Sequence, residues 1–426
     1  MTTEQLYPLF TASKGICTDT RKIEAGTIFF ALKGANFNGN EFAVKAIEAG
    51  CLWAVVDEKE HANHEKCIYV DDVLKSLQNL ARHHRRQFDI PVLGITGSNG
   101  KTTTKELIGA VLEKKFNVLM TEGNLNNHLG VPFTLLRLTK NHDFAVIEMG
   151  ANRPGDIKEL AEIAEPDYGI ITNIGAAHIE GFGSLQGVIE TKTALYRWIS
   201  KIEGLLFYNA DDEVLVNELP GTKTFSYGEL SGDVRGNLHN LTPFVQFSWS
   251  AADYKSDIVE TQLVGKYNFY NFLAAVAIGC YFKVDQAEIN EALRNYEPSN
   301  NRSQIKKTDR NILIVDCYNA NATSMKAALE SFHEVDHPSK IAILGDMLEL
   351  GDISAEEHQY VVDFLVENNL KAILVGTEFE KTNHPFESFP TSANLIEEKD
   401  FSKFSDHLVL LKGSRGIKLE NLIPLL

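Results

Sequence analysis

The chain of 426 residues is poor in basic side chains. Its 41 lysines and arginines stand against 58 aspartates and glutamates, which gives a formal net charge of −17. Nucleic-acid binding requires a basic surface that neutralises phosphates, so this composition argues against a nucleic-acid partner. An anionic ligand would instead need local devices, such as helix N-termini, single lysines or arginines, or metal ions. We therefore expect small-molecule partners.

Cysteine and long apolar runs are scarce as well. The five cysteines are scattered and form no Cys-x-x-Cys pair, which is typical of reduced thiols in a cytoplasmic protein. No segment approaches the ~20 uninterrupted apolar residues of a membrane helix. The N-terminal residues 1–15 lack a basic region followed by an apolar core. We expect a cytoplasmic protein with no membrane span and no signal peptide.

What the chain does contain is a repeated alternation of strand-like and helix-like segments. At roughly 150 residues per domain, its length suggests about three domains. The alternation predicts βαβ units and mainly parallel sheets, while residues 232–264 are interrupted by polar residues and predict antiparallel edge strands. We place the boundaries so that the predicted domains are 1–88, 89–297 and 298–426.

The individual elements follow from short apolar runs and from helical periodicity. Strands are predicted at 28–32, 51–57, 90–96, 143–149, 168–174, 311–316, 340–347, 371–376 and 407–413. Helices are predicted at 42–50, 77–89, 156–165, 268–282, 288–297 and 356–369, and also after Gly100 and from Ser324.

The strongest motif lies between the predicted strand 90–96 and the helix that follows it. It comprises Gly97, Ser98, Asn99, Gly100, Lys101, Thr102 and Thr103. Glycines let the backbone N–H groups converge on phosphate oxygens, and the helix N-terminus adds partial positive charge. Lys101 suits the β- and γ-phosphates, and the Thr102 hydroxyl suits magnesium. The spacing is G-x-x-G-K-T, with Ile95 where the commoner loop has its first glycine.

A metal ligand of the usual kind would end a neighbouring strand. Glu148 ends the apolar segment 143–149 and is the candidate. Alone it is weak evidence, but together with the phosphate loop it predicts a nucleotide-metal site.

Several further motifs together resemble the Mur ligase family, over essentially the whole chain. They are T-D-T-R (18–21), F-F-A-L-K-G (29–34), T-G-S-N-G-K-T-T (96–103), G-N-L-N-N-H-L-G-V-P (123–132), V-I-E-M-G-A-N (146–152), A-A-H-I-E-G-F-G-S (176–184), D-C-Y-N-A-N (316–321), L-G-D-M-L-E-L-G (344–351) and L-K-G-S-R-G (411–416). The phosphate loop is shared with folylpolyglutamate synthases. The segments G-N-L-N-N and L-G-D-M-L-E-L-G resemble the branch that adds D-alanyl-D-alanine to UDP-N-acetylmuramoyl-tripeptide.

The resemblance implies an α/β fold of three domains. These are a small N-terminal UDP-binding domain, a central P-loop ATPase domain with a parallel sheet, and a C-terminal Rossmann-like domain. It also implies a monomeric, ATP-dependent acid–D-amino-acid ligase of peptidoglycan precursor synthesis that uses two Mg²⁺ sites. In the family reaction the tripeptide carboxylate attacks the γ-phosphate of ATP, and the amine of D-alanyl-D-alanine then attacks the acyl phosphate.

The resemblance also implies roles for individual residues. Lys101, Lys192 and His178 are the catalytic candidates. The metal candidates are Thr102, Glu148, His178 and Lys192, the last in carbamylated form. Candidates for ATP binding are residues 97–103, Asn268, Asn271, Arg302, Asp316, Tyr318 and Asn319. Candidates for the UDP-substrate are Thr18, Asp19, Thr20, Arg21, Asn124, Asn126 and Asn127, and Ser414 and Arg415 are placed at the peptide end.

The chain departs from the family pattern at a few positions. Ala194 stands where many members have glutamate, and Ala322 stands where proline is common. The segment F-N-G-N (37–40) replaces F-D-G-H, which leaves the uridine contacts there open.

Two other interpretations stay open at this point. One is a ligase of the same fold with another amine acceptor, such as a folylpolyglutamate synthase. The other is a nucleotide-dependent switch or motor, which would hydrolyse ATP without an amine substrate and would not need His178 or Lys192. ATP turnover with the UDP-linked tripeptide, with and without D-alanyl-D-alanine, separates all three.

Overall fold

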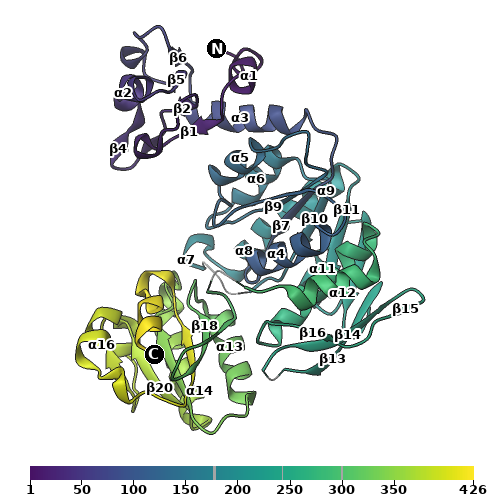
Figure 1. Ribbon diagram of the computed structural model, residues 1–426, viewed down its shortest axis with the longest axis vertical. Coiled ribbons are helices and arrows are strands. Elements are labelled where there is room, and N and C mark those ends of the chain that lie inside the picture. The colour runs from purple at the N-terminus through teal and green to yellow at the C-terminus, as the bar shows by residue number, and fades with distance from the viewer. Residues whose placement is uncertain (176–178, 242, 299–300) are drawn as a thin grey trace. The chain divides into compact units, whose positions relative to one another are not determined.

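The computed structural model describes residues 1–175, 179–241, 243–298 and 301–426. These residues form three larger sheets, which are flanked by helices, and one two-stranded sheet (Figure 1). Contacts divide the chain into two compact units. The first comprises residues 1–95, 116–151 and 155–169, and the second comprises residues 96–115, 152–154 and 170–426.

The N-terminal sheet has four parallel strands in the order β1-β2-β5-β6. Their bounds are Ile16–Cys17, Ile28–Phe30, Trp53–Val56 and Cys67–Tyr69, and the small hairpin β3–β4 spans Lys33–Gly34 and Phe37–Asn38. The helices are α1 (Thr3–Thr11), α2 (Ala43–Glu48) and α3 (Val73–Arg85). Helix α3 begins four residues before the predicted start, because Asp72 caps it by accepting from the Lys75 N–H at 2.8 Å.

The central sheet has ten strands, with the path β15-β14-β13-β12-β11-β10-β7-β9-β8 and β16 beside β14. Its strands are β7 (Val92–Thr96), β8 (Val118–Met120), β9 (Phe144–Glu148), β10 (Tyr168–Ile171), β11 (Leu205–Asn209), β12 (Lys223–Gly228), β13 (Val234–Asn240), β14 (Gln246–Ala251), β15 (Tyr254–Lys255) and β16 (Val259–Glu260). Strand β14 pairs antiparallel with β13, β15 and β16, which confirms antiparallel strands within the segment 232–264, whereas β13 is parallel to β12, so the sheet is mixed.

Nine helices belong to the described residues of this part of the chain. They are α4 (Lys101–Leu112), α5 (Gly130–Leu135), α6 (Asp156–Ala164), α7 (Ile179–Phe182), α8 (Leu185–Lys192), α9 (Ala194–Lys201), α10 (Glu213–Asn217), α11 (Tyr267–Tyr281) and α12 (Gln286–Asn295). Helix α11 packs against α4 and against strands β11 to β13. It is apolar on nearly every side, which is why its sequence shows little amphipathic periodicity.

The C-terminal sheet has six strands in the order β17-β18-β22-β19-β20-β21, and only β17 is antiparallel to its neighbour. The strands are β17 (Gln304–Lys307), β18 (Ile312–Asp316), β19 (Lys340–Gly345), β20 (Lys371–Val375), β21 (Glu387–Phe389) and β22 (Leu408–Lys412). The helices are α13 (Ala322–Glu334), α14 (Ser354–Glu367), α15 (Thr377–Glu380) and α16 (Ser392–Glu398).

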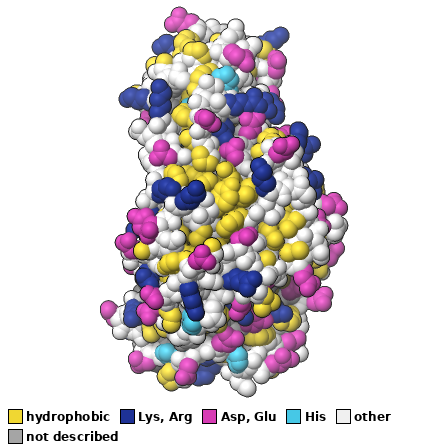
Figure 2. Space-filling view, turned by 90° about the vertical axis from the view of Figure 1, so that its right-hand side faces the viewer, with side chains coloured by type: hydrophobic (Ala, Val, Ile, Leu, Met, Phe, Trp, Pro, Cys, Tyr) yellow, Lys and Arg dark blue, Asp and Glu magenta, His cyan; other side chains and the backbone are white. Residues whose placement is uncertain are grey.

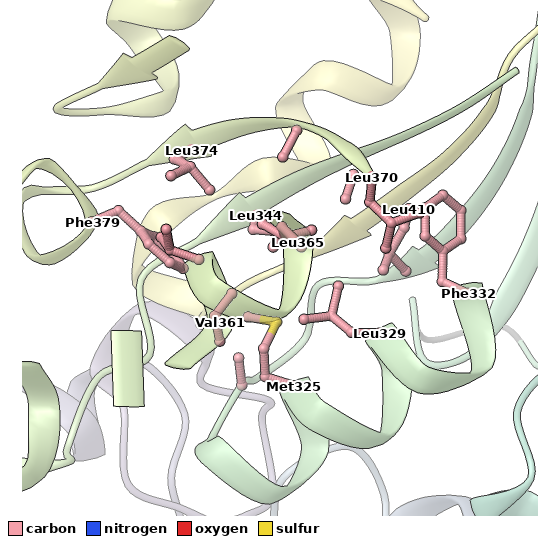
Figure 3. Packing of buried hydrophobic residues seen from close by; sticks show 14 of the residues in the cluster. Met325, Leu329, Phe332, Leu344, Val361, Leu365, Leu370, Leu374, Phe379 and Leu410 are labelled. Atoms are coloured by element: carbon pink, nitrogen blue, oxygen red, sulfur yellow. The ribbon is translucent and has the colours of Figure 1, made fainter. Parts of the chain in front are cut away.

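Both faces of this sheet are buried. Successive residues of a strand point to opposite faces, so Ala342 and Leu344 join one apolar cluster while Ile341 and Ile343 join the other. Figure 3 shows the first cluster, where Met325 and Leu329 of α13 and Val361 and Leu365 of α14 point toward the sheet. Burial on both sides explains the continuous apolar runs from which these strands were predicted.

The surface carries charges of both signs. On the face shown in Figure 2, acidic and basic side chains are interspersed, and a group of hydrophobic side chains lies near its middle.

None of the described helices is long and apolar enough to span a membrane. The five cysteines are free thiols, and burial raises the pKa of Cys280 and of Cys317 to about 12.

Two adjacent residues of α14 test the C-terminal core. Leu365 is fully buried in the cluster of Figure 3, whereas Val366 is 48% exposed. We expect Leu365→Ala to cost about 2–5 kcal/mol because it leaves a cavity. The matched surface change Val366→Ala should stay within about 0.5 kcal/mol. Hydrogen exchange over β19 and β20 measures both, and equal effects of the two changes would contradict the packing described.

Candidate active site

The phosphate loop connects β7 to α4, and two of its residues must be glycine. Gly97 has φ +148°, and a Cβ there would lie 1.9 Å from the Thr172 hydroxyl oxygen. Gly100 has φ +77° as the residue before α4, and a Cβ there would lie 2.9 Å from Asn271 Oδ1. Both positions therefore exclude a side chain by conformation and by space, which would let a phosphate approach the backbone of the loop closely.

The loop is held in this shape by the segment that follows β10. The Ser98 hydroxyl donates to the Gly175 carbonyl at 3.0 Å, and the Asn99 N–H donates to Asn173 Oδ1 at 3.0 Å. The Thr172 hydroxyl donates to the Asn99 carbonyl at 2.6 Å. Sequence reasoning missed Thr172 and Asn173. The available signal was a pair of polar residues at the end of an apolar parallel strand.

Two lysines converge on one backbone oxygen of the loop. Lys101 Nζ donates to the Gly97 carbonyl at 2.8 Å and to the Ser98 carbonyl at 3.2 Å. Lys192 Nζ, from the end of α8, donates to the same Gly97 carbonyl at 2.9 Å. Each of the two catalytic lysines predicted from the sequence therefore lies at the phosphate loop.

Lys192 is buried to an extent that is unusual for a lysine, with 1% of it exposed. Burial, and after it the nearby charge of Lys101, holds the pKa of its amine well below the usual range. Among the residues that the structure describes, this amine donates to the Gly97 carbonyl, and no carboxylate lies within ion-pair distance of it. The Phe182 ring centroid lies 5.9 Å away.

Glu148 ends β9 and is buried. Its register partner in β7 is Ile95, two residues before Gly97 in the chain. The Glu148 N–H donates to the Thr121 hydroxyl at 2.9 Å, and Glu148 Oε1 accepts from Asn126 Nδ2 at 2.8 Å. The predicted metal ligand thus stands at the carboxyl edge of the strand beside β7. His178, the other predicted ligand from this part of the chain, lies outside the described residues.

The three asparagines of the segment 123–127 have three different surroundings. Asn126 contacts Glu148, as described. Asn127 Oδ1 accepts from the N–H groups of Leu129 and Gly130 and so caps the start of α5. Asn124 is exposed, as Asn127 is, and can therefore meet a ligand from solvent.

Asn268 and Asn271 are buried on α11 and bind other parts of the protein. Asn271 Oδ1 accepts from the Thr104 hydroxyl at 3.0 Å, and Asn271 Nδ2 donates to Asn268 Oδ1 at 2.9 Å. Asn268 Nδ2 donates to the Val264 carbonyl at 2.7 Å. The two amides therefore link α11 to the helix that follows the phosphate loop.

In the C-terminal sheet, Asp316 ends β18 and forms an ion pair with a buried lysine. Lys412 Nζ of β22 lies 2.6 Å from Asp316 Oδ2, and the Ser303 N–H donates to Asp316 Oδ1 at 3.2 Å. Sequence reasoning missed Lys412. A lysine inside the apolar run 407–413 was the signal, because lysine is rarely fully buried without a partner.

The Tyr318 ring is contacted by two arginines. The guanidinium carbon of Arg302 is 3.8 Å from the Tyr318 ring centroid, and that of Arg415 is 5.4 Å away. The residues on either side of Arg302 are both left-handed, with φ +56° at Asn301 and +49° at Ser303. Stacking of this kind is worth about 0.5–2 kcal/mol and fixes the orientation of the guanidinium groups.

The rest of the loop after β18 is short and capped. Asn319 is exposed, and Asn321 caps α13 in a reciprocal arrangement with Ser324. Ala322 is the first residue of α13, a position where proline is favoured because it stabilises the start of a helix. Here the Asn321 cap stabilises the start of α13 instead.

The segment 344–351 is fastened to its neighbours by two side chains. Asp346 accepts from the N–H groups of Glu378 and Phe379 at 3.0 Å each. The Ser414 hydroxyl accepts from the Leu348 N–H at 2.9 Å and donates to the Ala320 carbonyl at 3.2 Å. Ser414 thereby joins the loops after β18, β19 and β22 at the carboxyl edge of the sheet, where open α/β sheets bind ligands.

In the N-terminal unit, the four predicted UDP-site residues form one turn, Thr18 to Arg21. Asp19 begins the short 3₁₀ helix Thr20–Lys22, and Arg21 donates to both Asp19 oxygens, at 2.9 and 2.8 Å. The hydrogen bond from Arg21 holds the pKa of Asp19 well below its usual range. In the F-N-G-N segment, Asn40 is buried and donates to Asn38 and Asp57 at 2.9 Å each. The two asparagines that replace the family's aspartate and histidine therefore bond within the fold.

Three profiles of one family match the chain. The Mur ligase middle domain matches residues 95–279, the glutamate ligase domain of Mur ligases matches residues 301–415, and the Mur ligase family catalytic domain matches residues 13–87.

Full-length relatives agree with these profiles. The UDP-N-acetylmuramoyl-tripeptide–D-alanyl-D-alanine ligase of Bacillus subtilis is 34% identical over 97% of this chain and 93% of its own length. The crystal structure of MurF from Acinetobacter baumannii is 31% identical with a TM-score of 0.88, covering 99% of this chain and 98% of its own. The structure of MurF ligase from Thermotoga maritima in complex with ADP is 26% identical with a TM-score of 0.87, covering 97% of each chain. The chain therefore belongs to the Mur ligase family and has its three-domain α/β fold.

Proposed function

We propose that this chain is the ATP-dependent ligase that joins D-alanyl-D-alanine to UDP-N-acetylmuramoyl-tripeptide in peptidoglycan synthesis. The observation that carries the proposal is the match, over nearly the whole chain, to relatives that bear this enzyme's name. The phosphate loop with its two lysines supplies the chemistry that such a ligase requires.

In this proposal ATP binds with its β- and γ-phosphates at the loop 97–103 and the N-terminus of α4. Lys101, which contacts its own loop, swings from the Gly97 carbonyl to the phosphates. Asp316 accepts from a ribose hydroxyl, with Arg302, Tyr318 and Asn319 as the other C-terminal contributors. The pair with the buried Lys412 supports this assignment, because it holds the Asp316 carboxylate in one orientation. Asn268 and Asn271 contribute to nucleotide binding by holding α4, the helix that follows the phosphate loop.

The side chains present fit magnesium. Mg²⁺ prefers oxygen ligands, and the buried Thr102 hydroxyl and Glu148 carboxylate are of that kind. We assign them to one site, and His178 and Lys192 to a second. When bound, the ions would neutralise phosphate charge and bring the triphosphate and an incoming carboxylate together.

Lys192 fits a role as a carbamate. A neutral amine adds CO2 whereas an ammonium does not, and the burial of Lys192 disfavours the ammonium. Carbamylation converts this buried neutral amine into an anion, with release of a proton, and the negative charge would suit a neighbouring metal ion.

The chemistry then follows from charge. The tripeptide carboxylate and the triphosphate repel each other, so Lys101 and the loop N–H groups lower the barrier by taking up phosphate charge. Attack on the γ-phosphorus gives an acyl phosphate and ADP. The deprotonated amine of D-alanyl-D-alanine attacks the acyl carbon, and inorganic phosphate leaves as the amide forms.

For the UDP-substrate we propose Thr18, Asp19, Thr20 and Arg21 at the nucleotide end, since Arg21 is exposed and its guanidinium suits a diphosphate. Asn124 faces the muramoyl-peptide, with Asn126 and Asn127 in the same segment. Ser414 and Arg415 are assigned to the peptide end.

The domain division 1–88, 89–297 and 298–426 is part of this proposal and is supported by the three larger sheets, which are separate from one another. A monomeric state and a cytoplasmic location stay predictions.

Turnover with defined substrates tests the function. We expect ADP release to require both UDP-N-acetylmuramoyl-tripeptide and D-alanyl-D-alanine, with one amide formed for each ADP. Glutamate or a folate in place of these substrates serves as the control for the related ligases. ATP hydrolysis that does not depend on either substrate would contradict the proposal and favour a switch or motor.

Lys101→Ala tests the phosphate loop. We expect turnover to fall about a hundredfold or more, because a group that stabilises developing phosphate charge is lost, while thermal unfolding changes little. The matched control is Lys114→Ala, which removes a surface ion pair with Glu291 at 3.2 Å. A Lys101→Ala enzyme with the rate of the unchanged protein would remove Lys101 from the mechanism.

Lys192→Ala tests the carbamate. Acyl-phosphate formation should be lost while ATP still binds, and small carboxylic acids should partly restore the rate by occupying the vacated space. In the unchanged protein, ¹³C NMR with labelled bicarbonate should show one carbamate signal that Lys192→Ala removes and Lys201→Ala keeps. Normal turnover by Lys192→Ala would overturn the assignment.

A further inference from the structure

One contact joins the asparagine-rich segment to the predicted metal ligand. Asn126 Nδ2 donates to Glu148 Oε1 at 2.8 Å, across 22 residues of chain. Glu148 is 1% exposed, so few water molecules can compete for this oxygen. Sequence reasoning grouped Asn126 with Asn124 and Asn127 as a substrate contact, whereas the structure directs its amide at Glu148.

The backbone around Asn126 fixes the position of its amide. The Asn126 carbonyl accepts from the Gly150 N–H at 2.7 Å, and the Asn126 N–H donates to the Asn124 carbonyl at 2.8 Å. A Cβ on Gly150 would lie 2.8 Å from Asn126 Oδ1 and 2.9 Å from its Cγ. The amide therefore occupies the space that the absent side chain of Gly150 leaves, directly after the strand end that carries Glu148.

We propose that Asn126 is a positioning residue that orients the Glu148 carboxylate for metal binding. A side-chain donor on Oε1 fixes the rotation of the carboxylate about its last bond, and it does so without adding charge. Outer-shell donors of this kind hold ligand carboxylates in place, and their loss typically weakens metal binding by about 10–100-fold. The proposal rests on the assignment of Glu148 as a metal ligand in the proposed function.

Metal affinity in the full chain tests it. The probe is Mn²⁺, titrated against the enzyme with a non-hydrolysable ATP analogue and followed by the EPR signal of the free ion. We expect Asn126→Ala to weaken Mn²⁺ binding about tenfold or more, with nucleotide affinity in the absence of metal unchanged. The Mg²⁺ concentration for half-maximal turnover should rise by a similar factor, and kcat at saturating Mg²⁺ should largely return.

Asn141→Ala is the matched control, because Asn141 precedes the opposite, amino end of β9 and is exposed. It should leave Mn²⁺ affinity unchanged. Gly150→Ala is an independent variant that keeps Asn126 but displaces its amide, and it should weaken Mn²⁺ binding in the same way. Thermal unfolding of the metal-free proteins identifies a variant that fails to fold, and the other variant then carries the test.

Glu148→Gln separates the two levels of the argument. If it leaves Mn²⁺ affinity unchanged, the metal assignment in the proposed function is wrong, and the role of Asn126 is wrong with it. If Glu148→Gln weakens Mn²⁺ binding while folded Asn126→Ala and Gly150→Ala bind it normally, Glu148 stands as a ligand and the positioning role is overturned.

Discussion

The carbonyl oxygen of Gly97 accepts hydrogen bonds from two lysines, one from its own loop and one from 95 residues further along the chain. This arrangement requires a loop that turns through left-handed conformations at Gly97 and Gly100, and it requires α8 to deliver a lysine into a dry interior. Two ammonium groups near one another repel, and burial together with the charge of Lys101 lowers the pKa of the Lys192 amine, so an anion beside the two amines would relieve the repulsion. The phosphates of ATP and a carbamate are both anions of that kind.

An acidic chain can bind a triphosphate because its positive charge is concentrated rather than widespread. The net charge is −17, yet the phosphate loop combines two lysines with the N-terminus of α4. The C-terminal sheet repeats this local strategy with Arg302 and Arg415 on the faces of Tyr318 and with Lys412 paired to Asp316. In the C-terminal sheet a neighbouring aromatic ring or carboxylate holds each of these cations in one orientation.

Local patterns were enough to predict much of this fold. The strand 90–96, the loop 97–103 and the position of Glu148 could be predicted because each depends on a few adjacent residues. The start of α3 was placed four residues late because the cap at Asp72 was not recognised, and helices α1, α8 and α9 were not identified. The partner of each asparagine in 124–127 could not be predicted, since three amides in a tight run look alike until the strand beside them is placed. The burial of Lys192 and Lys412 also depends on contacts between segments about a hundred residues apart.

The pairing of Asn126 with Glu148 has a consequence for the chemical lifetime of the enzyme. A side-chain amide is among the least durable groups in a protein, and its slow hydrolysis converts asparagine to aspartate. At residue 126 the product would be an aspartate. Its carboxylate would face the Glu148 carboxylate, to which the Asn126 amide now donates at 2.8 Å, and the two negative charges would repel each other. The same conversion at Asn99, which is followed by Gly100, would add a negative charge to the loop that must receive phosphates. Old molecules of this protein would therefore lose activity by gaining charge at the site, while their cores stayed intact.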